Sequence, residues 1–146
     1  MRFFQIYEII DRDTYYKYSE RETIQEAWKL FTPDLLYSLD GLRDFLGSPI
    51  SVNNWWGNTS TYARQYCGYR PPECTVGAQF SQHRMGNAAD CHIKGADYDK
   101  MRLHIMENKD DERLIKIMRI EATVPWLHID MGKIPKGRNR IYLFRA

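Results

Sequence analysis

Two histidines and an aspartate stand out among the 146 residues because together they match the ligands of a metal ion. His83 and Asp90 are separated by Gly86, which allows the chain to turn between them, and His128 lies further along. Two imidazoles and one carboxylate are a common zinc ligand set that leaves a position for water. The sequence therefore predicts a zinc site at His83, Asp90 and His128, although spacing alone does not bring residues 83 and 128 together.

The segment around His128 has the alternation of a strand with one polar face. Leu127 and Ile129 point to the side opposite His128 and Asp130, because side chains alternate along a strand. A polar pair on an otherwise apolar strand needs partners, and a metal ion would supply one. The alternative is a pair of hydrogen-bonded residues that hold the fold without any metal.

The elements that must position these residues follow from apolar periodicity and capping residues. Ser19 and Glu22 have the spacing of a capping box, Thr32-Pro33 is typical of a helix start, and Gly47 of a helix end. The predicted helices cover 19–30, 33–46 and 97–107, the predicted strands cover 2–10, 49–53, 87–93, 114–122, 126–131 and 140–145, and a long loop covers 54–80. This order predicts an α+β fold with N-terminal helices packed on a mainly antiparallel sheet.

Several motifs resemble those of a known enzyme family. The pattern Ser81-x-His83-x-x-Gly86-x-Ala88-x-Asp90, the segment Trp126-Leu127-His128-Ile129-Asp130 and the upstream Gly68-Tyr69-Arg70 follow one another in the family's order. They resemble the zinc D-alanyl-D-alanine carboxypeptidases and L-alanyl-D-glutamate endopeptidases, which share a superfamily with lysostaphin-type peptidases and the hedgehog domain. Asn53-Asn54-Trp55 is similar to a segment of small bacteriophage members.

This resemblance implies a function as well as a fold. It implies one hedgehog-like or DD-peptidase-like domain over 1–146, in which His83, Asp90 and His128 bind Zn²⁺. The substrate would be a peptide of peptidoglycan, as for a phage lysis or wall-degrading enzyme. Arg70 would face the active site and stabilise an oxyanion or hold a substrate carboxylate through its planar guanidinium.

The chain departs from the family pattern at the catalytic base. Carboxypeptidase members carry a glutamate three residues before the last histidine, where this chain has Pro125. Glu121 is the candidate base, with a solvated strand end or an ion pair to Arg119 as the alternative. Asp130 is the second candidate, unless it only orients a ligand histidine. The missing glutamate also favours a competing hypothesis, a non-catalytic zinc-containing structural or binding domain such as a virion component.

Composition excludes several other classes. Apolar residues at 43% and charged residues at 27% are typical of one globular domain, and no apolar run reaches the length of a membrane span. A net charge of +2 gives little reason to expect nucleic-acid binding, and the cations Lys133, Lys136, Arg138 and Arg140 are expected in a solvated loop. No signal peptide is recognisable, so we expect synthesis in the cytoplasm, with later release to the wall or carriage in a virion.

The remaining reactive side chains are expected to have supporting roles. The three cysteines match no metal-binding spacing and are expected as free thiols, with a Cys67–Cys74 bridge as the oxidised alternative. His92 is expected beside the site without binding the metal. Trp55 and Trp56 either line a substrate groove or anchor the loop.

Overall fold

The computed structural model describes residues 1–145 and has an α+β architecture, as predicted. Within these residues it contains α1 (Arg12–Glu20), α2 (Pro33–Leu46), α3 (Tyr98–Glu107), β1 (Ala88–Cys91), β2 (Arg119–Glu121), β3 (Leu127–Asp130) and β4 (Tyr142–Phe144). Short 3₁₀ helices cover Ile6–Glu8, Ile24–Leu30, Trp55–Gly57, Gln82–Met85 and Glu112–Leu114. None of the helices in this part of the chain has both the length and the apolar character that crossing a membrane requires.

The four strands form one mixed sheet in the order β1-β3-β2-β4. β1, β3 and β2 pair antiparallel, whereas β4 runs parallel to β2. The long connection over 131–141 carries the chain past β2, so that β4 joins the far edge instead of pairing with β3. The expected sheet is thus antiparallel in three of its strands and parallel at one edge.

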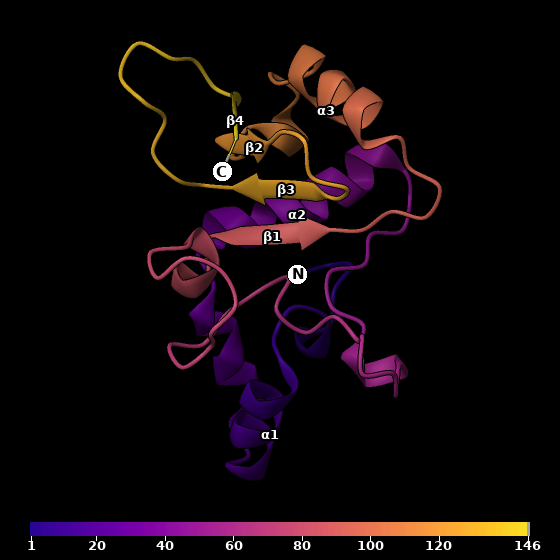
Figure 1. The fold of residues 1–146 in the computed structure, drawn as a ribbon, viewed down its shortest axis with the longest axis vertical. Helices are drawn as coiled ribbons and strands as arrows, with labels where there is room; N and C mark the ends of the chain where they lie inside the picture. Colours follow the sequence, from indigo (N-terminus) through magenta and orange to yellow (C-terminus); the bar gives the residue numbers. More distant parts are fainter. Residues whose placement is uncertain (146) are drawn as a thin grey trace.

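Helix α2 covers one face of this sheet, and Figure 1 shows it behind β1 and β3. The helix begins and ends where the sequence predicts, because Thr32 accepts a hydrogen bond from the Leu35 N–H at 3.4 Å and Gly47 adopts a φ of 61°. Its fully buried Leu35, Leu39 and Leu42 belong to the same apolar core as Ile120 and Ile129 of the sheet. Burial of this face is the main force that holds the sheet in place.

The structure of the first thirty residues differs from two of the predictions. The expected edge strand over 2–10 is wrong, because consecutive Ile9 and Ile10 are both fully buried in a turn, which a strand's alternation does not allow. The expected helix over 19–30 is also wrong. Asp11 caps α1 by accepting from the Thr14 N–H at 3.0 Å, so the helix ends where the Ser19 capping box would have begun it. Figure 1 shows α1 extending away from the sheet, so only α2 of the N-terminal helices covers it.

The other predicted strands are shorter than expected. Residues 49–53 supply only an isolated bridge between Ser51 and His92, and the expected strand over 114–122 is reduced to Arg119–Glu121 because Leu114 ends a 3₁₀ turn. The predicted strands over 87–93, 126–131 and 140–145 are confirmed as β1, β3 and β4 with trimmed ends. The long loop over 54–80 is confirmed, apart from the 3₁₀ turn at Trp55.

Gly86 is the tightest point between the N-terminal half and the sheet. Its φ is 62°, and a Cβ atom there would lie 1.7 Å from the backbone oxygen of Leu30. The Gly86 carbonyl also accepts from the Thr32 N–H at 3.0 Å. The turn that leads from His83 into β1 therefore requires glycine both for its conformation and for its contact.

We expect Gly86→Ala to lower the free energy of unfolding by more than about 3 kcal/mol, since it adds a backbone collision to the left-handed penalty. Gly95→Ala is the matched control: its φ is 73°, with no atom within 4 Å of the added methyl, so about 1–2 kcal/mol is expected. Urea denaturation of both variants measures the difference. Equal losses would contradict the role of the Leu30 contact.

Candidate metal centre

The sheet carries its polar side chains on the face opposite α2. In β1 and β3, Asp90 lies across from His128, and in β2 and β3, Arg119 lies across from Asp130. Residues that face one another across a pair of strands share one side of the sheet, while their neighbours point to the other side. One face is therefore apolar and packed on α2, and the other brings four ionisable side chains together.

His83 reaches this face from outside the sheet. It lies in the 3₁₀ turn Gln82–Met85, whose cap Ser81 accepts from the His83 backbone N–H at 3.4 Å. The His83 ring donates from Nδ1 to the carbonyl oxygen of Gly68 at 2.8 Å. Its Nε2 then lies 3.5 Å from Oδ1 of Asp90. The structure thus brings residue 83 to the sheet, as the metal hypothesis required.

The three predicted ligands come together in a buried cluster that could hold a metal ion. His128 Nδ1 lies 2.7 Å from Oδ1 of Asp90, and one ligand atom from each of His83, Asp90 and His128 lies within 4.8 Å of the others. The exposed fractions are 2% for His83, 6% for Asp90 and 7% for His128. The three side chains are therefore close enough to share one ion, and the predicted proximity of residues 83, 90 and 128 is confirmed.

The hydrogen bonds behind the two imidazoles orient both rings in a way that suits a cation at this point. The Gly68 carbonyl can only accept, so His83 Nδ1 carries the proton and the Nε2 lone pair of the neutral ring faces Asp90. Likewise His128 Nε2 lies 3.2 Å from Oδ2 of Asp130, which leaves Nδ1 to face Asp90 when that ring is neutral. Two lone pairs and a carboxylate oxygen thus converge, and such a set is suited to bind a cation.

Without a metal, a proton on His128 supplies that positive charge. Burial of the ring lowers its pKa, but the hydrogen bonds to Asp130 and Asp90 outweigh burial and raise the pKa to about 9. For Asp90, burial raises the pKa, while the hydrogen bonds from His128 and His83 hold it well below its usual range. The metal-free cluster therefore contains a charged imidazole between two carboxylates.

Asp130 has no oxygen left over for proton transfer. Arg119 donates to it from Nε at 2.6 Å and from Nη2 at 3.0 Å, and the Gly132 N–H donates at 2.8 Å. Although burial raises the pKa of Asp130, the bonds with His128 and Arg119 lower it overall. These contacts favour the orienting role of Asp130 behind His128 over the alternative of a catalytic base.

Arg70 holds the other oxygen of Asp90. Its Nη2 lies 3.2 Å from Asp90 Oδ2, and its Nε donates to the carbonyl oxygen of Tyr66 at 2.8 Å. Arg70 therefore lies at the site, as the Gly-Tyr-Arg motif predicts, but one edge of its guanidinium is already committed to a candidate ligand.

Glu121 lines the cavity that opens over the cluster. This cavity, of about 480 Å³, is lined by the three candidate ligands and by Phe80 and Phe144. Within residues 1–145 no cation lies within ion-pair distance of Glu121, and Arg119 pairs with Asp130 instead. The alternative of a Glu121–Arg119 ion pair is therefore wrong, and Glu121 is a carboxylate directed at the same cavity as the candidate ligands.

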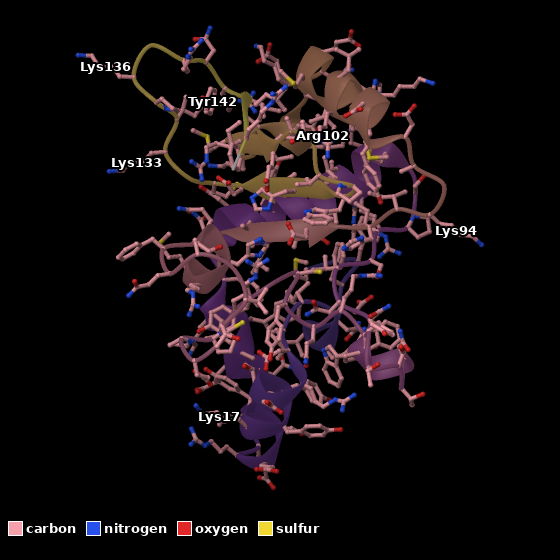
Figure 2. All side chains as sticks on the ribbon, viewed as in Figure 1. Lys17, Lys94, Arg102, Lys133, Lys136 and Tyr142 are labelled. Carbon is pink, nitrogen blue, oxygen red and sulfur yellow. The ribbon has the colours of Figure 1, made fainter. Side chains whose placement is uncertain are left out.

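Arg102 holds the loop that leads into β3 and was missed by the sequence analysis. This arginine of α3 is buried, and its Nη2 donates to the carbonyl oxygens of Val124 and of Trp126, the latter at 2.6 Å. Figure 2 shows it between α3 and the sheet. In the sequence, nothing about an arginine placed between Asp99 and Leu103 indicates that its side chain is buried.

The remaining candidates lie away from the metal-binding point. His92 is excluded from the cluster, and its Nε2 lies 3.6 Å from the Sγ of Cys67. The three cysteines are free thiols. Trp55 and Trp56 contact Tyr15 and Tyr7 instead of the cavity, so they anchor the loop. Figure 2 shows Lys133 and Lys136 pointing away from the sheet, whereas Arg140 donates to the Leu114 carbonyl at 3.0 Å.

Comparison with protein-family models, with curated proteins and with solved structures returned no match, so the geometry of the site carries the functional argument.

We expect the metal-stripped protein to lose stability as the pH rises from about 6.5 to about 9. His128 has a raised pKa when folded, so its contribution is complete below 6.5 and disappears as the pH passes about 9. The expected loss is on the order of 3 kcal/mol. Urea denaturation in chelator across this range measures it, with His128→Gln as the control for other titrating groups. Parallel curves for the two proteins would contradict this assignment.

We expect Asp130→Asn to weaken divalent-metal binding about 10-fold to 100-fold, because the acceptor that fixes the His128 ring loses its charge. Asp110→Asn makes the same change on the surface, where Asp110 pairs with Lys109, and should leave affinity unchanged. Calorimetric titration with Zn²⁺ compares the two. Equal affinities for Asp130→Asn and the wild type would show that Asp130 does not support the metal.

Proposed function

We propose that this protein is a zinc-dependent peptidase that hydrolyses peptide bonds in peptidoglycan stem peptides. The observation that carries the proposal is the convergence of two imidazole lone pairs and one carboxylate oxygen on a buried point beneath a cavity. Two nitrogens and one oxygen, each held by a further hydrogen bond, are a donor set that favours zinc and leaves a position for water or substrate.

Zinc, when bound, polarises a carbonyl group and makes water a nucleophile near neutral pH. The residues of the chain would do the rest. Glu121 is the general base, because it is the one carboxylate on the cavity wall that has no cation paired with it in the described chain. It would accept a proton from the attacking water and return it to the leaving amine.

The two arginines that line the cavity would act through their positive charge and would not transfer protons. Arg70 neutralises the outer oxygen of Asp90 and lines the cavity, where it would stabilise negative charge that develops on the peptide carbonyl. Arg119 holds Asp130 and thereby the His128 ring. In this proposal Asp130 and Arg119 position the ligand, and Glu121 carries out the proton transfer.

The choice of substrate is supported by the sequence motifs and by the size of the cavity. The motifs at 68–70, 81–90 and 126–130 resemble those of the wall carboxypeptidases and endopeptidases, and we propose the hedgehog-like or DD-peptidase-like fold on the same ground. A cavity of about 480 Å³ accommodates a few residues of a peptide. A role in phage lysis, or in a virion that enters through the wall, fits this substrate.

One observation favours a second function, a non-catalytic zinc domain. Pro125, in the loop before β3, stands where the enzymes that the motifs resemble carry the base, and Glu121 would have to replace it from the end of β2. If Glu121 does not act, the same centre would only fasten the His83 turn to the sheet.

We expect one zinc ion per wild-type chain, together with release of new amino termini from purified peptidoglycan. Glu121→Gln should retain zinc and lose activity about 10²-fold to 10⁴-fold, since it removes only the base. His83→Ala should lose both. Metal analysis and amino-group release, measured side by side, check the three proteins. Zinc without cleavage of any wall type would favour the non-catalytic function, and absence of zinc would overturn the centre.

A further inference from the structure

A second cavity continues from the candidate centre past the outer edge of β1. It has a volume of about 620 Å³ and shares four lining residues with the first cavity: Arg70, Gly77, Asp90 and Trp126. β1 is an edge strand, and the Cys67 carbonyl accepts from the Asp90 N–H at 2.7 Å, so residues 61–67 form the far wall. The two cavities are therefore lobes of one groove, an inner lobe that contains Glu121 and an outer lobe beyond Asp90.

The two lobes differ in charge. The inner lobe is lined by Glu121, Asp130 and Arg119 in addition to the candidate ligands. In the outer lobe, Asp90 is the one acidic residue among the described lining residues, and it already pairs with Arg70. The outer lobe therefore retains one uncompensated positive charge, that of Arg64.

Arg64 is held in place by neutral acceptors. Its Nε donates to the Val52 carbonyl at 3.4 Å and its Nη2 to the Ser51 hydroxyl at 3.2 Å. No carboxylate of residues 1–145 lies within ion-pair distance of it. A half-buried guanidinium without a counter-ion keeps its charge available to an anion that enters the lobe, and the planar geometry of its N–H donors suits a carboxylate. This separates it from Arg70, whose charge is engaged by Asp90.

We infer that the outer lobe binds a carboxylate group of the substrate and that Arg64 is the residue that selects it. The inference rests on the proposed peptidase function for the identity of the substrate. It moves the role of carboxylate anchor, one of the two roles expected of Arg70, to a residue six positions earlier on the far wall of the groove. The peptide would extend from the inner lobe across Asp90 into the outer lobe.

A stem peptide offers two sources for this carboxylate, the free carboxylate of its glutamate and its carboxyl terminus. Three synthetic stem pentapeptides distinguish them: one with both groups free, one amidated at the glutamate and one amidated at the carboxyl terminus. We expect kcat/KM of the zinc-loaded wild type to fall about 10-fold to 100-fold for one of the amidated peptides, the effect of losing one charge-assisted pair. No change with either amidated peptide would overturn the inference.

Variants of Arg64 test whether this residue is responsible for the selectivity between free and amidated peptides. Arg64→Gln should lower kcat/KM for the free peptide by a similar factor and should no longer respond to the critical amidation, because both changes remove the same pair. Arg64→Lys should retain part of the selectivity. Arg138→Gln removes an exposed arginine of the 132–140 loop and should match the wild type. Independent, multiplying effects of Arg64→Gln and amidation would contradict the assignment.

Binding measurements separate this inference from the peptidase proposal. Calorimetry of the three peptides with zinc-loaded Glu121→Gln reports selectivity for the carboxylate without any cleavage. Arg64-dependent binding in a protein that cuts nothing would uphold the inference and refute the peptidase. Cleavage that ignores both amidations would uphold the peptidase and refute the inference. If Arg64→Gln melts early, Arg64→Lys tests the residue: full wild-type selectivity in a variant with weaker binding of all three peptides would contradict the assignment.

Discussion

The buried carboxylate of Asp90 is the contact on which the rest of the site depends. Its Oδ1 faces both imidazoles and its Oδ2 faces Arg70, so one side chain joins a strand, a 3₁₀ turn and the long loop. A charge at this depth is stable only when its partners are in place, because burial opposes its ionisation. The surrounding hydrogen bonds fix the orientation of those partners: the Gly68 carbonyl orients His83, and the Arg119–Asp130 pair orients His128.

The two faces of the sheet explain how such short strands can carry a site. One face gains its stability from apolar packing of residues such as Ile120 and Ile129 against α2. The opposite face is therefore free to hold charged groups, each compensated by a neighbour across the strands. Alternate residues of each strand form the polar and the apolar face, so a slip of one residue in register would exchange the two faces.

The sequence predicted which residues of the candidate site come together better than it predicted the elements around them. Metal-ligand types and the alternation around His128 identified the three residues that converge, and capping residues identified α2 correctly. The predicted helix over 19–30 was wrong because the Ser19–Glu22 spacing occurs by chance at the end of a helix. The predicted strand over 2–10 was wrong because Ile9 and Ile10 are buried by a turn that no local pattern reveals. The burial of Arg102 and the position of Arg64 in the outer lobe could not be recognised, since they depend on carbonyl groups and cavity walls that only the tertiary fold brings near.

Gly68 connects the candidate centre to the beginning of the chain. Its carbonyl oxygen accepts the hydrogen bond from His83 Nδ1, and a Cβ atom on Gly68 would lie 2.0 Å from the backbone oxygen of Ile9. The next residue, Tyr69, donates its N–H to that same oxygen at 2.9 Å. Ordering of the amino-terminal segment and correct presentation of the imidazole are thus thermodynamically linked. Metal occupancy would protect the first ten residues from proteolysis, and fraying of those residues would in turn promote release of the ion, although the two lie on different segments of the fold.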